Sequence, residues 1–204
     1  QCHQTVLKLA QTTEDNQETT ISLYYLGIAH ASLSQYSQAI EFHRQALGIF
    51  QQIGDYYGES SSLNDLGYAY HMLGQHTQAI NFCQQALEIK RQIGDRLGES
   101  ISFNNLSFAY RALGQYSQAI DLCQQALEIK RQIGDLLGES ISLSDLSNSY
   151  YALGQYTQAI DLCQQALKIK QQIGDRLGEA IVWSNLGRAL AKLDQKFEAR
   201  NAYQ

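Results

Sequence analysis

Three cysteines recur at intervals of forty residues and are the first candidates for chemistry: Cys83, Cys123 and Cys163. Zinc binding requires several thiolates or imidazoles within about 2.3 Å of one ion. Equivalent residues of stacked helical units lie roughly two helix diameters apart, about 20 Å. The fourth cysteine, Cys2, completes no Cys-x-x-Cys motif. We therefore expect small buried core thiols and no metal site.

The five histidines are scattered along the chain. His30 and His76 stand where other copies of the forty-residue unit carry tyrosine, which predicts packing positions. His71 is the histidine expected on a binding surface, where its titration would make binding mildly pH-sensitive. A catalytic nucleophile needs a base within hydrogen-bond reach, and no such pair can be assigned. We expect no catalytic residues and no cofactor.

A unit of forty residues repeats along the chain without insertion or deletion. Residues 91–130 and 131–170 differ at nine positions and are identical at the other 31. Self-similarity at a fixed period of this length predicts a solenoid, in which each unit buries its apolar face against its neighbours. We predict one domain over residues 1–204, cut from a longer array, with a leftover helix at 1–13 and repeats of about 15–54, 55–94, 95–134, 135–174 and 175–204, the last one truncated.

Each unit reads as two antiparallel helices separated by glycine. Gly94 can take the left-handed conformation that ends a helix, and Asp95 is a good N-cap for the next one. Ile101, Leu106 and Tyr110 would form the apolar face of the first helix, which ends before Gly114. The Gly-Asp-x-x-Gly-Glu loops lack the lysine of a phosphate loop and the acidic spacing of an EF-hand. Their recurrence favours punctuation between helices.

Composition excludes several classes of protein. The net charge is −5, without the clustered basic residues of a nucleic-acid surface. No apolar stretch approaches the roughly 20 residues of a membrane span, and no signal peptide opens the chain. The absence of proline suits an all-helical chain. We expect a cytoplasmic protein with neither nucleic-acid nor membrane partners.

The apolar and glycine positions resemble the tetratricopeptide repeat over about residues 20–204. In the second repeat, at about 55–94, the motif comprises Leu63, Leu66, Gly67, Tyr70, Gly74, His76, Ala79 and Ala86. The usual period is about 34 residues. The forty-residue form is similar to the arrays of kinesin light chains, Pins-type adaptors and bacterial signalling proteins. The resemblance implies a right-handed superhelix of antiparallel helix pairs, whose first helices line a concave groove.

Four of the nine positions that differ between the two most similar units match groove positions of the family: 104, 105, 108 and 111. Variation confined to one face is expected where that face binds a ligand, although drift at exposed positions would produce the same pattern. Asparagine and serine can pair with a peptide backbone, and aromatic residues often anchor interfaces. The resemblance thus predicts a peptide-binding groove of Tyr24, Tyr25, Asn64, Asp65, Tyr68, His71, Asn104, Asn105, Phe108, Arg111, Ser144, Asp145, Asn148, Tyr151, Asn185 and Arg188.

The predicted function is a protein-interaction scaffold that binds a segment of a partner protein without catalysis. One alternative is self-assembly, because unfinished solenoid ends can stack head to tail. The other is a regulatory arm of a larger multidomain enzyme whose catalytic domain lies outside these residues.

Overall fold

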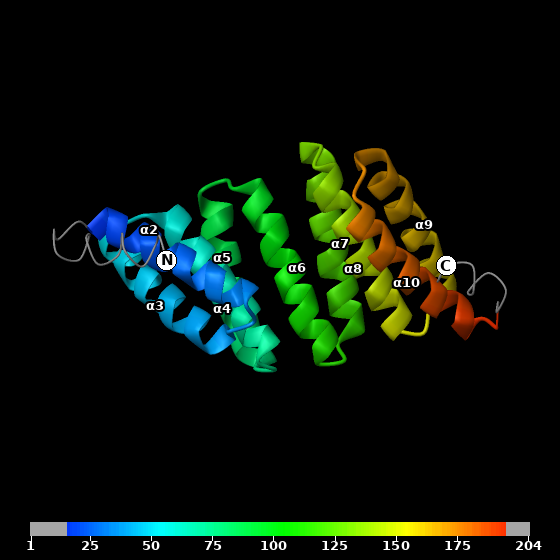
Figure 1. Ribbon diagram of the computed structural model, residues 1–204, viewed down its shortest axis with the longest axis horizontal. Helices are drawn as coiled ribbons and strands as arrows, with labels where there is room; N and C mark the ends of the chain where they lie inside the picture. Colours follow the sequence, from blue (N-terminus) through cyan, green and yellow to red (C-terminus); the bar gives the residue numbers. More distant parts are fainter. Residues whose placement is uncertain (1–15, 195–204) are drawn as a thin grey trace. The chain divides into compact units, whose positions relative to one another are not determined.

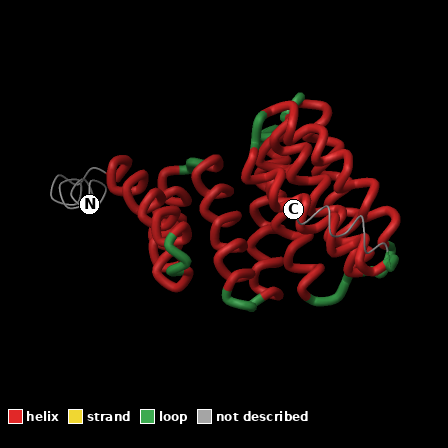
Figure 2. The backbone as a smooth tube through the Cα atoms, turned by 45° about the vertical axis from the view of Figure 1, so that its right-hand side comes forward, coloured by secondary structure: helices red, strands yellow, loops and turns green. Residues whose placement is uncertain are grey.

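The computed structural model describes residues 16–194, and every element in that range is an α-helix (Figures 1 and 2). Short loops join successive helices. The predicted leading helix at residues 1–13 and the end of the last repeat lie outside the described residues. The helices are α2 (Asn16–Ser32), α3 (Tyr36–Ile53), α4 (Tyr56–Met72), α5 (His76–Gln92), α6 (Arg96–Ala112), α7 (Tyr116–Ile133), α8 (Leu136–Ala152), α9 (Tyr156–Ile173) and α10 (Arg176–Lys192).

The helices form two compact units, each larger than one forty-residue repeat, and the boundary lies between Ala109 and Tyr110. From here on the first and second unit mean these two parts of the chain. In the first unit α2 packs on α3, α3 on α4 and α4 on α5. In the second, α7 packs on α8, α8 on α9 and α9 on α10, while α10 also contacts α8. Each unit is a run of stacked helix hairpins, so the all-α solenoid predicted from the sequence is confirmed. The predicted single domain with five repeats stays a prediction.

The loop that enters each first helix follows the predicted chemistry. Gly94 has a φ of 72°, in the left-handed region. Oδ1 of Asp95 accepts a hydrogen bond from the backbone N–H of Gly98 at 2.8 Å, which satisfies one of the free donors of the first turn. The other loop tolerates substitution, because Ser34 and Asp194 take a positive φ where the intervening repeats carry glycine. Helix boundaries therefore follow from local residue types.

The core confirms one part of the predicted apolar face and corrects another. Leu106 is 2% exposed, whereas Ile101 is 41% exposed and is not a core residue. Serines of the first helix are fully buried instead. Oγ of Ser100 donates to the carbonyl of Leu97 at 2.6 Å, and Oγ of Ser107 donates to the carbonyl of Asn104 at 2.7 Å. A small side chain bonded to its own helix lets two helices approach closely, so polarity alone misidentifies this face.

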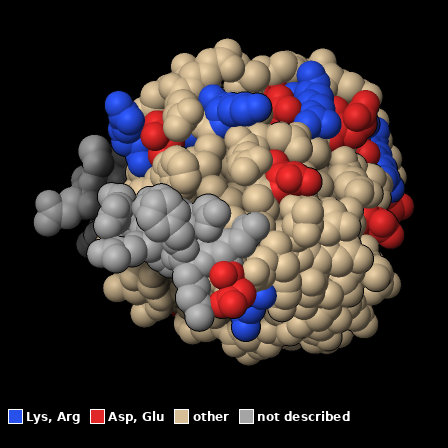
Figure 3. All heavy atoms as spheres, turned by 90° about the vertical axis from the view of Figure 1, so that its right-hand side faces the viewer, with Lys and Arg blue, Asp and Glu red and all other residues tan. Residues whose placement is uncertain are grey.

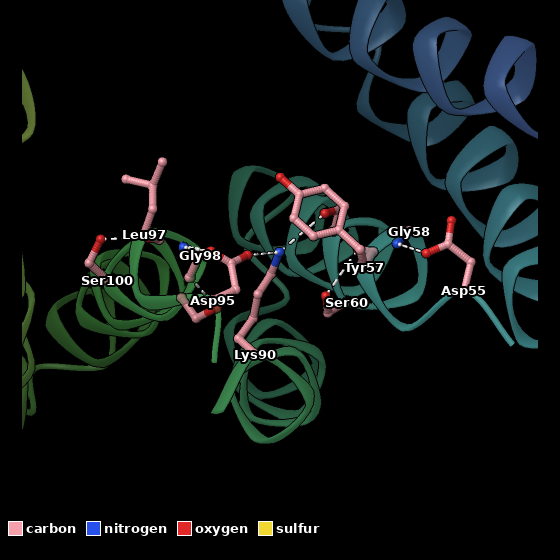
Figure 4. A network of polar contacts seen from close by, with 11 residues as sticks. Asp55, Tyr57, Gly58, Ser60, Lys90, Asp95, Leu97, Gly98 and Ser100 are labelled. Carbon is pink, nitrogen blue, oxygen red and sulfur yellow. Dashed lines mark hydrogen bonds and ion pairs between the residues drawn. The ribbon is translucent and has the colours of Figure 1, made fainter. Parts of the chain in front are cut away.

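On α5, α7 and α9 a buried lysine joins the second helix to the first helix of the next repeat, as Figure 4 shows for Lys90. Lys90 is 4% exposed, and its Nζ lies 2.9 Å from Oδ2 of Asp95. The aliphatic stem of Lys90 covers Gly98, where any Cβ would collide with it. The ammonium group also lies 4.5 Å from the ring centroid of Tyr57. The ion pair and the packing on glycine recur as Lys130–Asp135 over Gly138 and Lys170–Asp175 over Gly178.

Gly67 is required by close helix packing, and Gly48 provides a matched control. A Cβ at Gly67 would overlap Sγ of Cys83 and lie 3.2 Å from the carbonyl oxygen of Ala79, whereas nothing lies within 4 Å of a Cβ at Gly48. We expect Gly67→Ala to lower the free energy of unfolding by about 1–3 kcal/mol. Gly48→Ala should raise it by up to about 1 kcal/mol, because alanine favours helix. Urea denaturation followed by circular dichroism measures both, and equal effects would contradict this account.

The junction lysine predicts a graded response at Asp135. Asp135→Asn keeps an acceptor for the N–H of Gly138 but leaves Lys130 buried without a counterion. We expect a loss of about 1–2 kcal/mol, since Asp135 is itself partly solvated. Asp135→Ala should cost about 1 kcal/mol more, because the cap is lost too. Thermal or urea unfolding of the two variants checks the order, and an unchanged Asp135→Asn protein would refute it.

Candidate functional site

Each first helix carries a row of incompletely buried residues spaced three or four apart, which places them on one face. We call this row the open stripe. None of its members is classed as buried, although they range from half-buried to well exposed. The open stripes are Ile21, Tyr25 and Ile28 on α2; Tyr57, Ser61, Asp65 and Tyr68 on α4; Leu97, Ile101, Asn105 and Phe108 on α6; Leu137, Ile141, Asp145 and Asn148 on α8; and Leu177, Ile181, Asn185 and Arg188 on α10.

The first half of the open stripe is apolar on α6, α8 and α10, and sequence reasoning missed these residues. Leu177 and Ile181 are 76% and 56% exposed, and Leu137 and Ile141 are 50% and 41% exposed. The prediction relied on positions that differ between repeats, and the residue types at these positions are the same on α6, α8 and α10. The signal that could have found them is spacing. Leu137 and Ile141 precede Asp145 by eight and four residues, so the three share a helix face.

Four predicted site residues hold the same position in successive repeats and are largely buried beneath the open stripes. Asn64 is 6% exposed and Asn104 is 9% exposed, and the other members, Tyr24 and Ser144, are half-buried. Nδ2 of Asn105 donates to Oδ1 of Asn64 at 3.2 Å. The structure therefore brings predicted residues of successive first helices together, and it uses some of their hydrogen-bonding capacity between repeats.

Two carboxyl groups are held in surroundings that disfavour their charge. Burial raises the pKa of Asp65 to about 6, opposed by a hydrogen bond from the Tyr24 hydroxyl and by the charge of Lys90. Burial also raises the pKa of Asp145 to about 7, opposed by the charge of Arg111. Oδ2 of each is buried without a hydrogen-bond partner. Both carboxyl groups therefore accept a proton more readily than an exposed aspartate would.

Aromatic side chains surround the polar positions of the first unit. The rings of Tyr68 and Tyr36 meet edge to face with centroids 6.3 Å apart. His71 has its ring centroid 5.0 Å from that of His76 and 6.1 Å from that of Phe108. Phe108 and His71 are half-buried, and Tyr68 is 37% exposed. These rings offer apolar area on a partly rigid surface.

In the second unit a cation lies over an aromatic ring. The guanidinium carbon of Arg188 is 4.7 Å from the ring centroid of Tyr151. Its Nη1 lies 3.4 Å from Oδ1 of Asn185. Tyr151 also meets Tyr156 edge to face, with centroids 5.4 Å apart. Arg188, Asn185 and Tyr151 thus form one contiguous group across α8 and α10.

The cysteines and two of the histidines take the packing roles predicted for them. Cys83, Cys123 and Cys163 are fully buried, and burial raises the pKa of Cys83 to about 12. His30 stacks on Phe42 with ring centroids 5.1 Å apart, and His76 contacts the His71 ring.

A solenoid of stacked antiparallel helix hairpins defines the class of this protein. The comparison with protein families matches residues 58–132 and 139–204 to the tetratricopeptide repeat. The chain belongs to the tetratricopeptide repeat family. No curated protein matches its sequence.

Solved structures share the fold at low sequence identity. BtubC (BKLC) from P. vanneervenii matches with a TM-score of 0.84 and 18% identity, over 98% of this chain and 85% of that one. A Signal Transduction ATPase with Numerous Domains from Pyrococcus horikoshii, which has a tetratricopeptide repeat sensor, gives 0.80 and 21%, over 96% and 31%. NprR in complex with its cognate peptide NprX gives 0.73 and 21%, over 96% and 58%. At these identities the similarity establishes the fold alone.

The raised pKa of Asp145 predicts a stability difference that depends on pH. An aspartate with its ordinary pKa of 3.8 loses its proton well before Asp145 in the folded chain, whose pKa is about 7. The contribution of the protonated carboxyl is therefore complete below pH 3.8 and is lost as the pH rises to about 7. Asp145→Asn stays neutral throughout. At pH 8 we expect this variant to be more stable than the parent by on the order of 2 kcal/mol.

Urea denaturation between pH 4.5 and pH 8 measures this difference, which should shrink steadily toward the acid end. Asp121→Asn, at an exposed position on α7, is the matched control and should show no such trend. A difference that stays constant with pH would contradict the assignment.

Proposed function

We propose that this protein is a non-catalytic scaffold that binds a peptide segment of a partner protein on its open stripes. The observation that carries the proposal is the composition of those stripes. On α4, α6, α8 and α10 the stripe combines exposed aliphatic or aromatic residues with an amide or carboxyl group on one helix face, and on α2 it is aliphatic and aromatic throughout. Such a surface can bury apolar side chains of a peptide and pair with its backbone at the same time.

The contacts within the stripes support rigid presentation of these groups. Tyr68 is held by Tyr36, and Asn105 is oriented by its hydrogen bond to Asn64. Aromatic residues held in place lose little conformational entropy on binding and commonly dominate interface energy. NprR, whose fold is similar, is in complex with a cognate peptide. The sixteen residues predicted from the sequence remain the proposed contact set, joined by the aliphatic residues Leu137, Ile141, Leu177 and Ile181.

Charge favours a protein partner over nucleic acid. The net charge is −5, and basic and acidic side chains lie next to one another on the face that Figure 3 shows. No described helix combines the length and apolar character that a membrane crossing would need. We place the protein in the cytoplasm as part of the same proposal.

A sensor arm of a larger protein is a second candidate. The Pyrococcus horikoshii ATPase carries a tetratricopeptide repeat sensor, and this chain matches 31% of its length. In that case the bound peptide would regulate a domain outside these 204 residues.

A display selection tests peptide binding. A library of peptides tiled from a proteome is selected on the parent protein and on a variant with Tyr68→Ala, Phe108→Ala, Ile141→Ser and Ile181→Ser. We expect the parent to enrich a related set of peptides. The variant should bind them at least about tenfold more weakly, because its apolar anchors are truncated.

The matched control replaces four exposed glutamines on second helices with alanine: Gln84, Gln85, Gln164 and Gln165. It should retain the parent's peptides. Circular dichroism verifies that both variants are helical. Equal enrichment by the parent and the open-stripe variant, or no enrichment by the parent, would refute the proposal. In light scattering, a molecular mass that rises with protein concentration would favour self-assembly.

A further inference from the structure

Arg188 is an exposed cation whose guanidinium group contacts two neighbouring side chains. Its guanidinium lies over the ring of Tyr151 on α8, 4.7 Å from the centroid, and its Nη1 reaches Oδ1 of Asn185 one turn earlier on α10. The two helices contact each other directly. A guanidinium stacked on a ring is oriented before any ligand arrives, which reduces the entropy lost when it forms further hydrogen bonds.

Four cations of the same unit form ion pairs with carboxylates, and Arg188 is not among them. The charge of Arg111 acts on the carboxyl group of Asp145 and opposes the rise of its pKa. Arg188 has no carboxylate within ion-pair distance in the described part of the unit, and most of its donors remain available. The pairs formed by the other cations are Lys130–Asp135, Arg131–Glu139, Lys170–Asp175 and Arg176–Glu179.

Aliphatic residues continue the open stripe on one side of Arg188. Ile181 precedes it by seven residues and Leu177 by eleven, about 10 Å and 16 Å along the helix axis at 1.5 Å per residue. Ile141 and Leu137 hold the equivalent positions on the neighbouring α8. An extended peptide advances about 3.3 Å per residue. For a peptide that runs along α10, an apolar side chain over Ile181 therefore lies about three residues from a group bound at Arg188.

We propose that the second unit selects peptide segments in which an aspartate or glutamate, bound by Arg188, is followed or preceded about three residues away by a large apolar residue over Ile181. Carboxylate and guanidinium form paired hydrogen bonds of matched geometry. The carboxylate is that of a side chain rather than a chain end, because the helix continues beyond Arg188 with the exposed Ala191 and a segment is not required to stop there. This inference rests on the proposed peptide-binding function and names the class of segment bound.

Charge reversal tests it directly. A library of random ten-residue peptides, fused at both ends so that no free carboxyl terminus is present, is selected on the parent, on Arg188→Glu and on Lys168→Glu. Lys168 is exposed on α9, so its reversal changes the net charge equally at a site away from the open stripes. We expect the parent to enrich an acidic residue at a fixed distance from an apolar one. Arg188→Glu should replace that acidic residue with lysine or arginine, while Lys168→Glu keeps the parent's preference.

A double-mutant cycle provides the second measurement. The best peptide, acetylated and amidated, is compared with its glutamate-to-glutamine form by fluorescence anisotropy. The exchange should weaken binding to the parent about tenfold and leave binding to Arg188→Gln unchanged. A preference for acid that survives Arg188→Glu, or that Lys168→Glu also reverses, overturns the inference. Enriched peptides without an acidic residue overturn it while leaving the proposed function standing, and no enrichment by the parent overturns both.

Discussion

The buried lysine–aspartate pair at three of the described repeat junctions is the interaction on which the remaining geometry depends. Burying an ammonium group is costly unless a carboxylate faces it, and here the carboxylate that neutralises Lys90 also caps the next helix. The lysine stem lies on Gly98, which brings the end of one repeat against the start of the next. Phe50 replaces the lysine at the first described junction and packs in the same way on the glycine of the following repeat, Gly58. Helix capping, charge neutralisation and close packing are therefore met by one small group of residues.

The open stripes follow from this arrangement. Buried serines of α4, α6 and α8 lie in the core, whereas the aliphatic, aromatic and amide residues of the open stripes are left outside it. Hydrogen bonds such as Asn105 to Asn64 then tie neighbouring first helices of a unit together. The polar groups nearest the core stabilise the array, and those further out, including Arg188 and Asn148, are accessible to a ligand.

Much of the fold could be predicted because its signals are local. Gly94 and Asp95 mark a helix boundary through their own conformational and capping preferences, and the structure places both as expected. Ile101 was assigned to the core wrongly, because the rule that apolar residues are buried does not anticipate serines that bond to their own helix. The burial of Lys90 could not be foreseen from its charge. Its partner lies across a loop, outside the helix periodicity on which the prediction relied. In the candidate site, the sequence identified the positions whose residue type differs between repeats. It did not identify the aliphatic positions, because their residue types differ too little between repeats.

The junctions make the repeats interchangeable. Lys90, Lys130 and Lys170 meet the following repeat through the same two contacts, the ion pair to aspartate and the packing on glycine, and neither depends on which repeat comes next. An in-frame gain or loss of forty codons between these lysines leaves every junction complete. The gene can thus lengthen or shorten its array by unequal recombination, and the number of open stripes can change while the packing that supports them is kept.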